Sequence, residues 1–233
     1  MSVNYGTQDS RPVIGLGENE RAAFIANTYM HLFGAIIAFV ALEYYFFSSG
    51  IAARLAPLMT GNWMLVLGAF MVIGWLASAG ASRVSSPVVQ YLALAAFVVA
   101  EALIFIPMLL YANAYAPGVI QSAGMLTMIG FAGLTMVAFT MRKDFSFLNG
   151  ILMWGGIAAI LLIVGSLIFG FNLGTWFSVA MIALAGGAIL RDTSNIMLHY
   201  PQDRHVAAAL ALFSSVAMMF FYILRLLIAF NRD

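Results

Sequence analysis

Seven long apolar stretches constrain the fold of this 233-residue chain more than any other feature. They cover roughly residues 22–47, 63–81, 88–110, 119–140, 147–169, 175–190 and 206–230. A membrane-crossing α-helix needs about 20 consecutive apolar residues, because the hydrocarbon core of a bilayer is about 30 Å thick. The stretches are continuous, as in ILMWGGIAAILLIVGSLIF, whereas the strands of a transmembrane barrel alternate apolar and polar residues. The sequence therefore predicts an all-α polytopic membrane protein with seven transmembrane helices.

The composition of the chain is that of a membrane protein. Apolar residues make up 64% of it and charged residues 8%, against about 25% charged residues in a soluble domain. The connections between the apolar stretches are too short for a soluble domain. We therefore expect one membrane domain over residues 22–230 and a polar N-terminal tail over residues 1–21. The tail holds no apolar core, so we expect no cleavable signal peptide.

Charge and motif content argue against several classes of function. The formal net charge is +1, which provides no electrostatic case for a nucleic-acid partner. The chain has no cysteine, no H-E-x-x-H zinc motif and no G-x-S-x-G nucleophile elbow. Its one lysine, Lys143, falls in a loop, which argues against a Schiff base inside a helix. We expect a protein that is not an enzyme and uses no cofactor or metal, with the lipid bilayer as its first partner.

The distribution of arginine and lysine predicts the orientation in the membrane. With the N-terminus in the cytoplasm, seven basic residues lie at cytoplasmic helix ends and three lie toward the other face. Basic residues are enriched in cytoplasmic loops of membrane proteins. Together with the odd number of helices, this asymmetry predicts a multi-pass protein of the cell (inner) membrane with a cytoplasmic N-terminus and an outside C-terminus.

Three formally charged residues fall inside the predicted helices, where charge is costly and often functional. Glu101 lies about 20 Å from the cytoplasmic end of its helix. We expect it to line a polar cavity or to pair with Arg225. Glu43 and Arg225 lie at similar depths near the outer ends of the first and last helices. They are candidates for an intramembrane ion pair, although both are close enough to the interface to reach water by themselves.

Four short motifs follow one another along the chain. The first predicted helix contains Asn27-Thr28-Tyr29, and the last contains Leu224-Arg225-Leu226-Leu227. Between them lie R-K-D-F-S-F-L-N-G at residues 142–150 and D-T-S-N-I at residues 192–196. The two middle motifs resemble the T-R-K-D-x-S-F-L-G-G and [DE]-T-[QS]-x-I segments of the Bax inhibitor-1 (transmembrane Bax inhibitor motif) family. The residues of these two motifs are most similar to those of the bacterial YccA-like branch of that family. The motifs in the first and last predicted helices also fit the family.

The resemblance implies a bundle with the seventh helix at its centre, surrounded by the other six. Some family members are pH-sensitive calcium leak channels, in which an acid after helix six pairs with an acid in helix seven. Here the first acid is Asp192, but Ser215 occupies the second position. A serine cannot share a titrating proton at neutral pH, so the two-carboxylate gate does not carry over. Asp192 is left with Arg83 as a candidate partner, or with Arg191 or Arg204 in a structural salt bridge.

Two functions remain open after this comparison. The YccA-like branch implies a substrate and modulator of FtsH, the membrane-anchored AAA protease, which would engage the N-terminal tail with its charged residues Arg11, Glu18 and Glu20. The alternative is a pH-sensitive leak channel for Ca²⁺ or protons, with Asp192 and Glu101 on the ion path.

Overall fold

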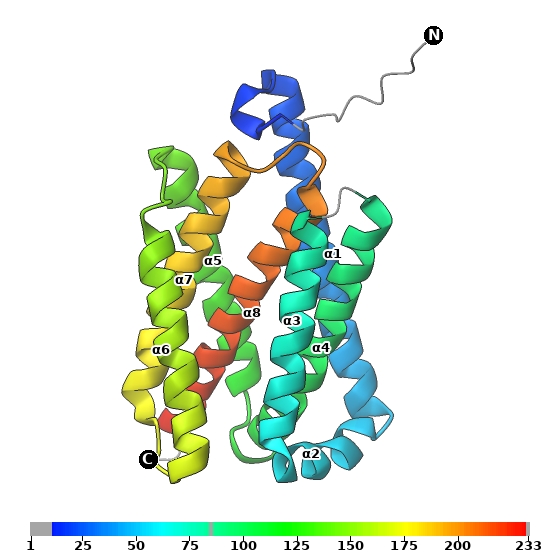
Figure 1. The fold of residues 1–233 in the computed structure, drawn as a ribbon. Coiled ribbons are helices and arrows are strands. Elements are labelled where there is room, and N and C mark those ends of the chain that lie inside the picture. Colours follow the sequence, from blue (N-terminus) through cyan, green and yellow to red (C-terminus); the bar gives the residue numbers. More distant parts are fainter. Residues whose placement is uncertain (1–10, 84–85, 232–233) are drawn as a thin grey trace.

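The computed structural model describes residues 11–83 and 86–231 of the chain, apart from the side chain of Arg83. After a short 3₁₀ turn, η1 (Val13–Gly15), come the helices α1 (Glu18–Ser48), α2 (Ile51–Gly61), α3 (Trp63–Arg83), α4 (Pro87–Tyr115), α5 (Val119–Met141), α6 (Leu148–Phe169), α7 (Gly174–Leu198) and α8 (His205–Phe230). Figure 1 shows the long helices side by side in one bundle, with α2 lying across one end. Within the described residues, seven helices (all but α2) are long and apolar enough to cross a membrane. The predicted all-α, seven-helix fold class is confirmed.

Three boundaries differ from the sequence prediction. Helix α1 begins at Glu18, so Glu18 and Glu20 lie in its first turn and not in a tail. Acidic side chains are favoured there because the helix dipole is positive at its N-terminus. The stretch predicted at 175–190 is part of α7, which continues to Leu198. Residues 51–61, expected as a connection, form α2 despite the proline at position 57.

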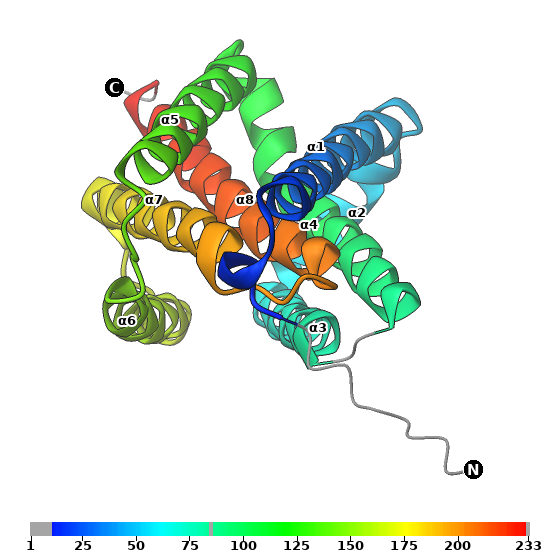
Figure 2. The ribbon, with the colours of Figure 1, turned by 90° about the horizontal axis from the view of Figure 1, so that it is seen from above.

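Helix α8 is the most buried of the seven long helices, and Figure 2 shows it passing between α1, α4, α5 and α7. Aromatic rings fix its register against α4. The rings of Phe105 and Phe220 stack with centroids 5.4 Å apart, and those of Phe97 and Phe213 meet edge to face at 6.2 Å. Such pairs add to the packing of the buried surface. The register places Glu101, midway between the two phenylalanines of α4, level with the middle of α8.

Helices α3 and α6 lie at one side of the bundle and pack on different neighbours. Helix α6 packs mainly on α7, whereas α3 packs on α4 and α8. The contact of α6 with α7 is close, since a Cβ added at Gly155 would lie 2.5 Å from a methyl group of Leu184. Small residues allow such approaches in membranes, where no hydrophobic effect drives helices together. Because α3 and α6 do not pack on one another, the space between these two helices is less filled than the rest of the bundle.

Candidate functional site

One buried polar group lies where α7 and α8 pack together. The carboxylate of Asp192, which is 3% exposed, accepts a hydrogen bond of 2.6 Å from the Ser215 hydroxyl at Oδ2. Its Oδ1 accepts a bond of 2.9 Å from Nη1 of Arg191, whose Nε in turn donates to Oδ1 of Asn149 at 2.6 Å. Both carboxylate oxygens therefore have a donor, as a buried charge requires. We call Arg191, Asp192 and Ser215 the Asp192 cluster.

The structure brings Asp192 together with Ser215 and Arg191. The side chain of Arg83 lies outside the described residues, so its pairing with Asp192 stays a prediction. Arg204 has other partners. Its Nη1 donates to the carbonyl oxygens of Ala81 and Ser82 at the end of α3, and its Nε lies 3.6 Å from Oδ2 of Asp203. Arg204 thus ties the α7–α8 loop to α3, because it supplies donors to carbonyls that the helix leaves free.

The two middle sequence motifs meet next to this cluster. The Ser194 hydroxyl donates to the Lys143 carbonyl and accepts from the Phe145 N–H, both at 3.1 Å. Beside it, Oδ1 of Asp144 accepts the Ser146 N–H at 2.8 Å, and Oδ2 lies 3.3 Å from Nε2 of His199. The Ser146 N–H and, to a smaller extent, His199 hold the pKa of Asp144 below its usual value. The motifs therefore join the α5–α6 connection to α7.

The segment before α1 docks on the α7–α8 loop. The Val13 N–H donates to the Tyr200 carbonyl at 2.9 Å, and the Gln202 N–H donates to the Arg11 carbonyl at 3.2 Å. The Val13 side chain is fully buried. Burial, and then the nearby Asp192 carboxylate, raise the pKa of Tyr200. We call residues 11–16 the docked segment. Arg11 belongs to it, so the described part of the predicted tail is attached to the helix bundle.

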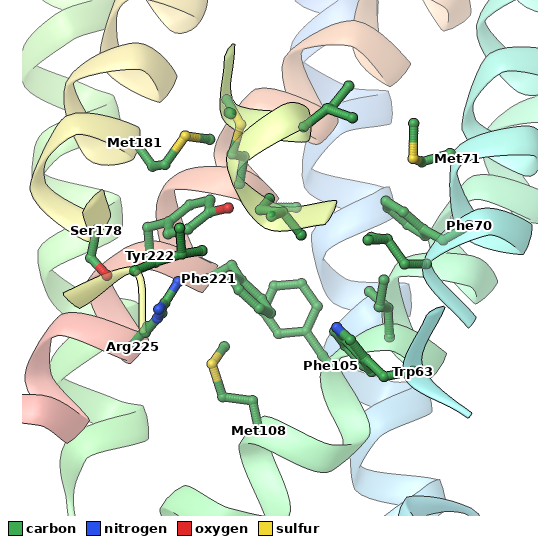
Figure 3. Close-up of a pocket in the computed structure, with 18 of the residues that line it drawn as sticks. Trp63, Phe70, Met71, Phe105, Met108, Ser178, Met181, Phe221, Tyr222 and Arg225 are labelled. Carbon is green, nitrogen blue, oxygen red and sulfur yellow. The ribbon is translucent and has the colours of Figure 1, made fainter. Parts of the chain in front are cut away.

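A cavity of about 1110 Å³ lies between α3 and α4 on one side and α6 and α7 on the other, with α8 behind it. Figure 3 shows Trp63, Phe70 and Met71 on one wall and Arg225 with Ser178 on the opposite wall. We call it the lateral cavity. Its remaining lining is mostly apolar, and it includes polar residues near both ends.

Glu101 lines this cavity at the level of the middle of α8. It is 5% exposed, and it forms no hydrogen bond or ion pair with any residue of the described chain. The expected pair with Arg225 is not formed, and the cavity that Glu101 lines is mostly apolar and not the polar cavity that was expected. A buried carboxyl group without a protein partner is costly, which marks the cavity as a place that a ligand or water would complete.

The structure does not form the expected pair between Glu43 and Arg225. Both carboxylate oxygens of Glu43 are buried without a hydrogen-bond partner among the described residues. The Arg225 guanidinium lies 5.6 Å from the ring centroid of Phe177 on α7. The two residues have a similar depth, but depth does not determine which way a side chain faces around its helix. The sequence alone does not give the direction in which each side chain faces around its helix.

No group of three or more His, Asp or Glu residues that could hold a metal ion occurs in the described chain.

Comparisons with known proteins agree with the motifs. A family described as "Inhibitor of apoptosis-promoting Bax1" matches residues 21–232. Two curated relatives, "Modulator of FtsH protease YccA" of Escherichia coli strain K12 and "Inner membrane protein YccA" of Escherichia coli O6:H1, are each 34% identical over 122 residues. That stretch is 48% of this chain and 55% of each relative. The match thus spans only about half of the relatives' length.

Proposed function

This chain belongs to the Bax inhibitor-1 family, and on that premise we propose that it is a non-enzymatic inner-membrane protein that modulates a membrane-anchored AAA protease of the FtsH type and is itself degraded by it. The similarity to the Escherichia coli modulator of FtsH protease carries this proposal. We place the N-terminus in the cytoplasm, following the distribution of basic residues.

The docked segment offers a physical basis for modulation. A protease of this class pulls a substrate from a reachable terminus. Before it could unfold α1, it would have to release the docked segment from the α7–α8 loop, which two backbone hydrogen bonds and the buried Val13 side chain oppose. A substrate that resists the first pull occupies the protease for longer and slows the degradation of other substrates.

Turnover in cells tests the proposal. The half-life of the full chain is measured with the protease active and inactive, together with a variant lacking residues 2–10, which leaves the docked segment and α1 intact. We expect protease-dependent loss of the full chain, and a longer-lived variant that slows the degradation of a second membrane substrate. A half-life of the full chain that does not depend on the protease contradicts the proposal.

A leak channel for Ca²⁺ or protons is the second candidate, favoured by the placement of Glu101 on the lateral cavity and of Asp192 against Ser215. Calcium flux into liposomes over a pH series separates the two functions, with Asp192→Asn as the comparison. The modulator proposal expects no pH-gated flux. A gated flux that Asp192→Asn abolishes would place the channel first.

A further inference from the structure

The lateral cavity is positioned so that a lipid of the surrounding bilayer can reach it. It is partly open, and it lies between α3 and α6, which do not pack on one another. Both helices are long and apolar enough to cross a membrane. An opening between two membrane-crossing helices faces hydrocarbon, and lipid acyl chains therefore have direct access to the cavity.

Arg225 provides a positive charge in the cavity, near the C-terminal end of α8. Its guanidinium lies over the Phe177 ring, and no acidic side chain of the described chain forms an ion pair with it. Ser178, on the same wall, contributes a hydroxyl (Figure 3). A planar guanidinium binds a phosphate through two parallel hydrogen bonds. The cavity therefore has an unneutralised cation suited to an anionic headgroup.

The depth of Arg225 matches the headgroup level of a bilayer. Helix α8 has 26 residues, a length of about 39 Å, which exceeds the hydrocarbon core of about 30 Å. Arg225 precedes the end of α8 at Phe230 by five residues, or about 8 Å. With α8 centred in the bilayer, Arg225 lies within about 3 Å of the hydrocarbon edge. A phospholipid can thus reach it without leaving its leaflet.

The part of the cavity between Arg225 and Ser214 matches one acyl chain in length. These two residues both line the cavity and lie eleven residues apart on α8, which is about 16 Å along the helix. The hydrocarbon of one leaflet is about 15 Å deep. The walls of this part are mostly apolar, with Leu67, Phe105 and Phe221 among them, and Glu101 is their acidic residue.

The depth of the cavity gives a bound lipid a direction. Glu101 lies level with the middle of α8, about 12 Å deeper than Arg225, and its carboxyl group has no hydrogen bond or ion pair among the described residues. An anion is costly at the depth of Glu101, so an anionic headgroup stays at Arg225 and the chain points inward. The volume of about 1110 Å³ leaves room at the inner end for water, at about 30 Å³ per molecule, to hydrate Glu101.

We propose that the lateral cavity binds one anionic phospholipid, with its phosphate on Arg225 and one acyl chain between α3 and α6. The proposal is independent of the protease and of ion conduction. It commits to a bilayer phospholipid because the depth of Arg225 and the length of the cavity between Arg225 and Ser214 both fit one leaflet.

Native mass spectrometry of the full purified chain tests the proposal, with phosphatidylglycerol as the probe and phosphatidylcholine and palmitate as comparisons. Arg225→Gln removes the charge, and Gly156→Leu fills the cavity, since a Cβ at Gly156 meets no atom within 4 Å. Arg54→Gln and Gly133→Leu are matched controls, because both positions are exposed and neither lines the cavity.

We expect one phosphatidylglycerol per chain, bound more tightly than phosphatidylcholine or palmitate. Arg225→Gln and Gly156→Leu should each weaken this binding by about tenfold or more, as expected for the loss of a charge-assisted contact or of the chain site, and the controls should bind as the wild type. Equal binding of palmitate or phosphatidylcholine, unchanged binding by either cavity variant, or an equal loss in the controls would overturn the proposal. Gly156→Leu keeps the test decisive if Arg225→Gln does not fold.

Discussion

The Asp192 cluster and the lateral cavity both place a carboxyl group inside the bundle, but only the carboxyl group of the cluster has hydrogen-bond partners. Asp192 accepts hydrogen bonds from Ser215 and Arg191 at 2.6 and 2.9 Å. Glu101 is similarly buried, lines the cavity and has no hydrogen bond or ion pair within the described chain. A buried polar group with its hydrogen-bond partners holds helices together. A buried polar group without them implies that a ligand or water supplies the missing partner. We therefore assign the cluster to the architecture and the cavity to a ligand.

Truncation of the two carboxylates should separate these roles most strongly. Asp192→Ala leaves the buried Ser215 hydroxyl without its acceptor and is expected to lower the free energy of unfolding by about 3 kcal/mol. Glu101→Ala removes a carboxyl group that has no hydrogen bond or ion pair in the described chain, and it should change the free energy by less than about 1 kcal/mol. Equilibrium unfolding in mixed micelles measures both, and equal losses would remove the distinction.

Adjacent serines on α8 offer a finer comparison. Ser215 donates to Asp192, whereas Ser214 lines the cavity. Ser215→Ala should cost about 2 kcal/mol, because it removes a hydrogen bond to a charged group, and Ser214→Ala less than about 0.5 kcal/mol. The same unfolding assay reports both values. A greater loss for Ser214→Ala would contradict the assignment.

The docked segment extends the architectural region toward the N-terminus. Val13→Ala removes fully buried methyl groups and should weaken docking by about 1 kcal/mol. Its neighbour Ile14 is 59% exposed and is the matched control. Limited proteolysis of the purified chain should cut the segment several-fold faster in Val13→Ala than in Ile14→Ala. Equal rates would show that Val13 does not hold the segment.

The smallest expected effect is on how stability depends on pH, and it arises from Asp144, which lies near the Asp192 cluster. The Ser146 N–H and His199 lower the pKa of Asp144 in the folded protein, relative to its ordinary value of 3.8. A lowered carboxyl pKa stabilises the fold above that ordinary value, and the contribution is lost as the pH falls through the lowered value. Thermal unfolding should therefore show a slightly smaller loss between pH 5 and pH 2 in Asp144→Asn than in the wild type. A larger loss in the variant would reverse the sign of this contribution.

Hydropathy predicts the number and approximate position of the membrane helices, because lipid requires long continuous apolar segments. It fails where polar residues are buried by other helices. The run from Arg191 to Asn195 is polar enough to indicate a loop, yet α7 continues through it to Leu198, because Ser215, Lys143 and Phe145 satisfy its side chains.

The candidate sites were predictable only in part. The rarity of charge inside the helices pointed to Glu101, and the resemblance to the family pointed to Asp192. The structure places Asp192 beside Ser215 and Glu101 on the cavity. The pairing of Glu43 with Arg225 depended on depth alone and is not formed. Which way a side chain faces around its helix depends on how the helices pack, and a single sequence does not contain that information directly.

The dependence of thermal stability on lipid tests the division between the two regions most directly. The wild type, Asp192→Asn and Arg225→Gln are unfolded by heat in bilayer discs of phosphatidylglycerol and of phosphatidylcholine. A ligand that binds only the folded state raises its stability, so the wild type should have a higher Tm in phosphatidylglycerol. Asp192→Asn should be less stable in both lipids but keep this difference, whereas Arg225→Gln should lose it. A lipid difference that persists in Arg225→Gln, or disappears in Asp192→Asn, would contradict the account.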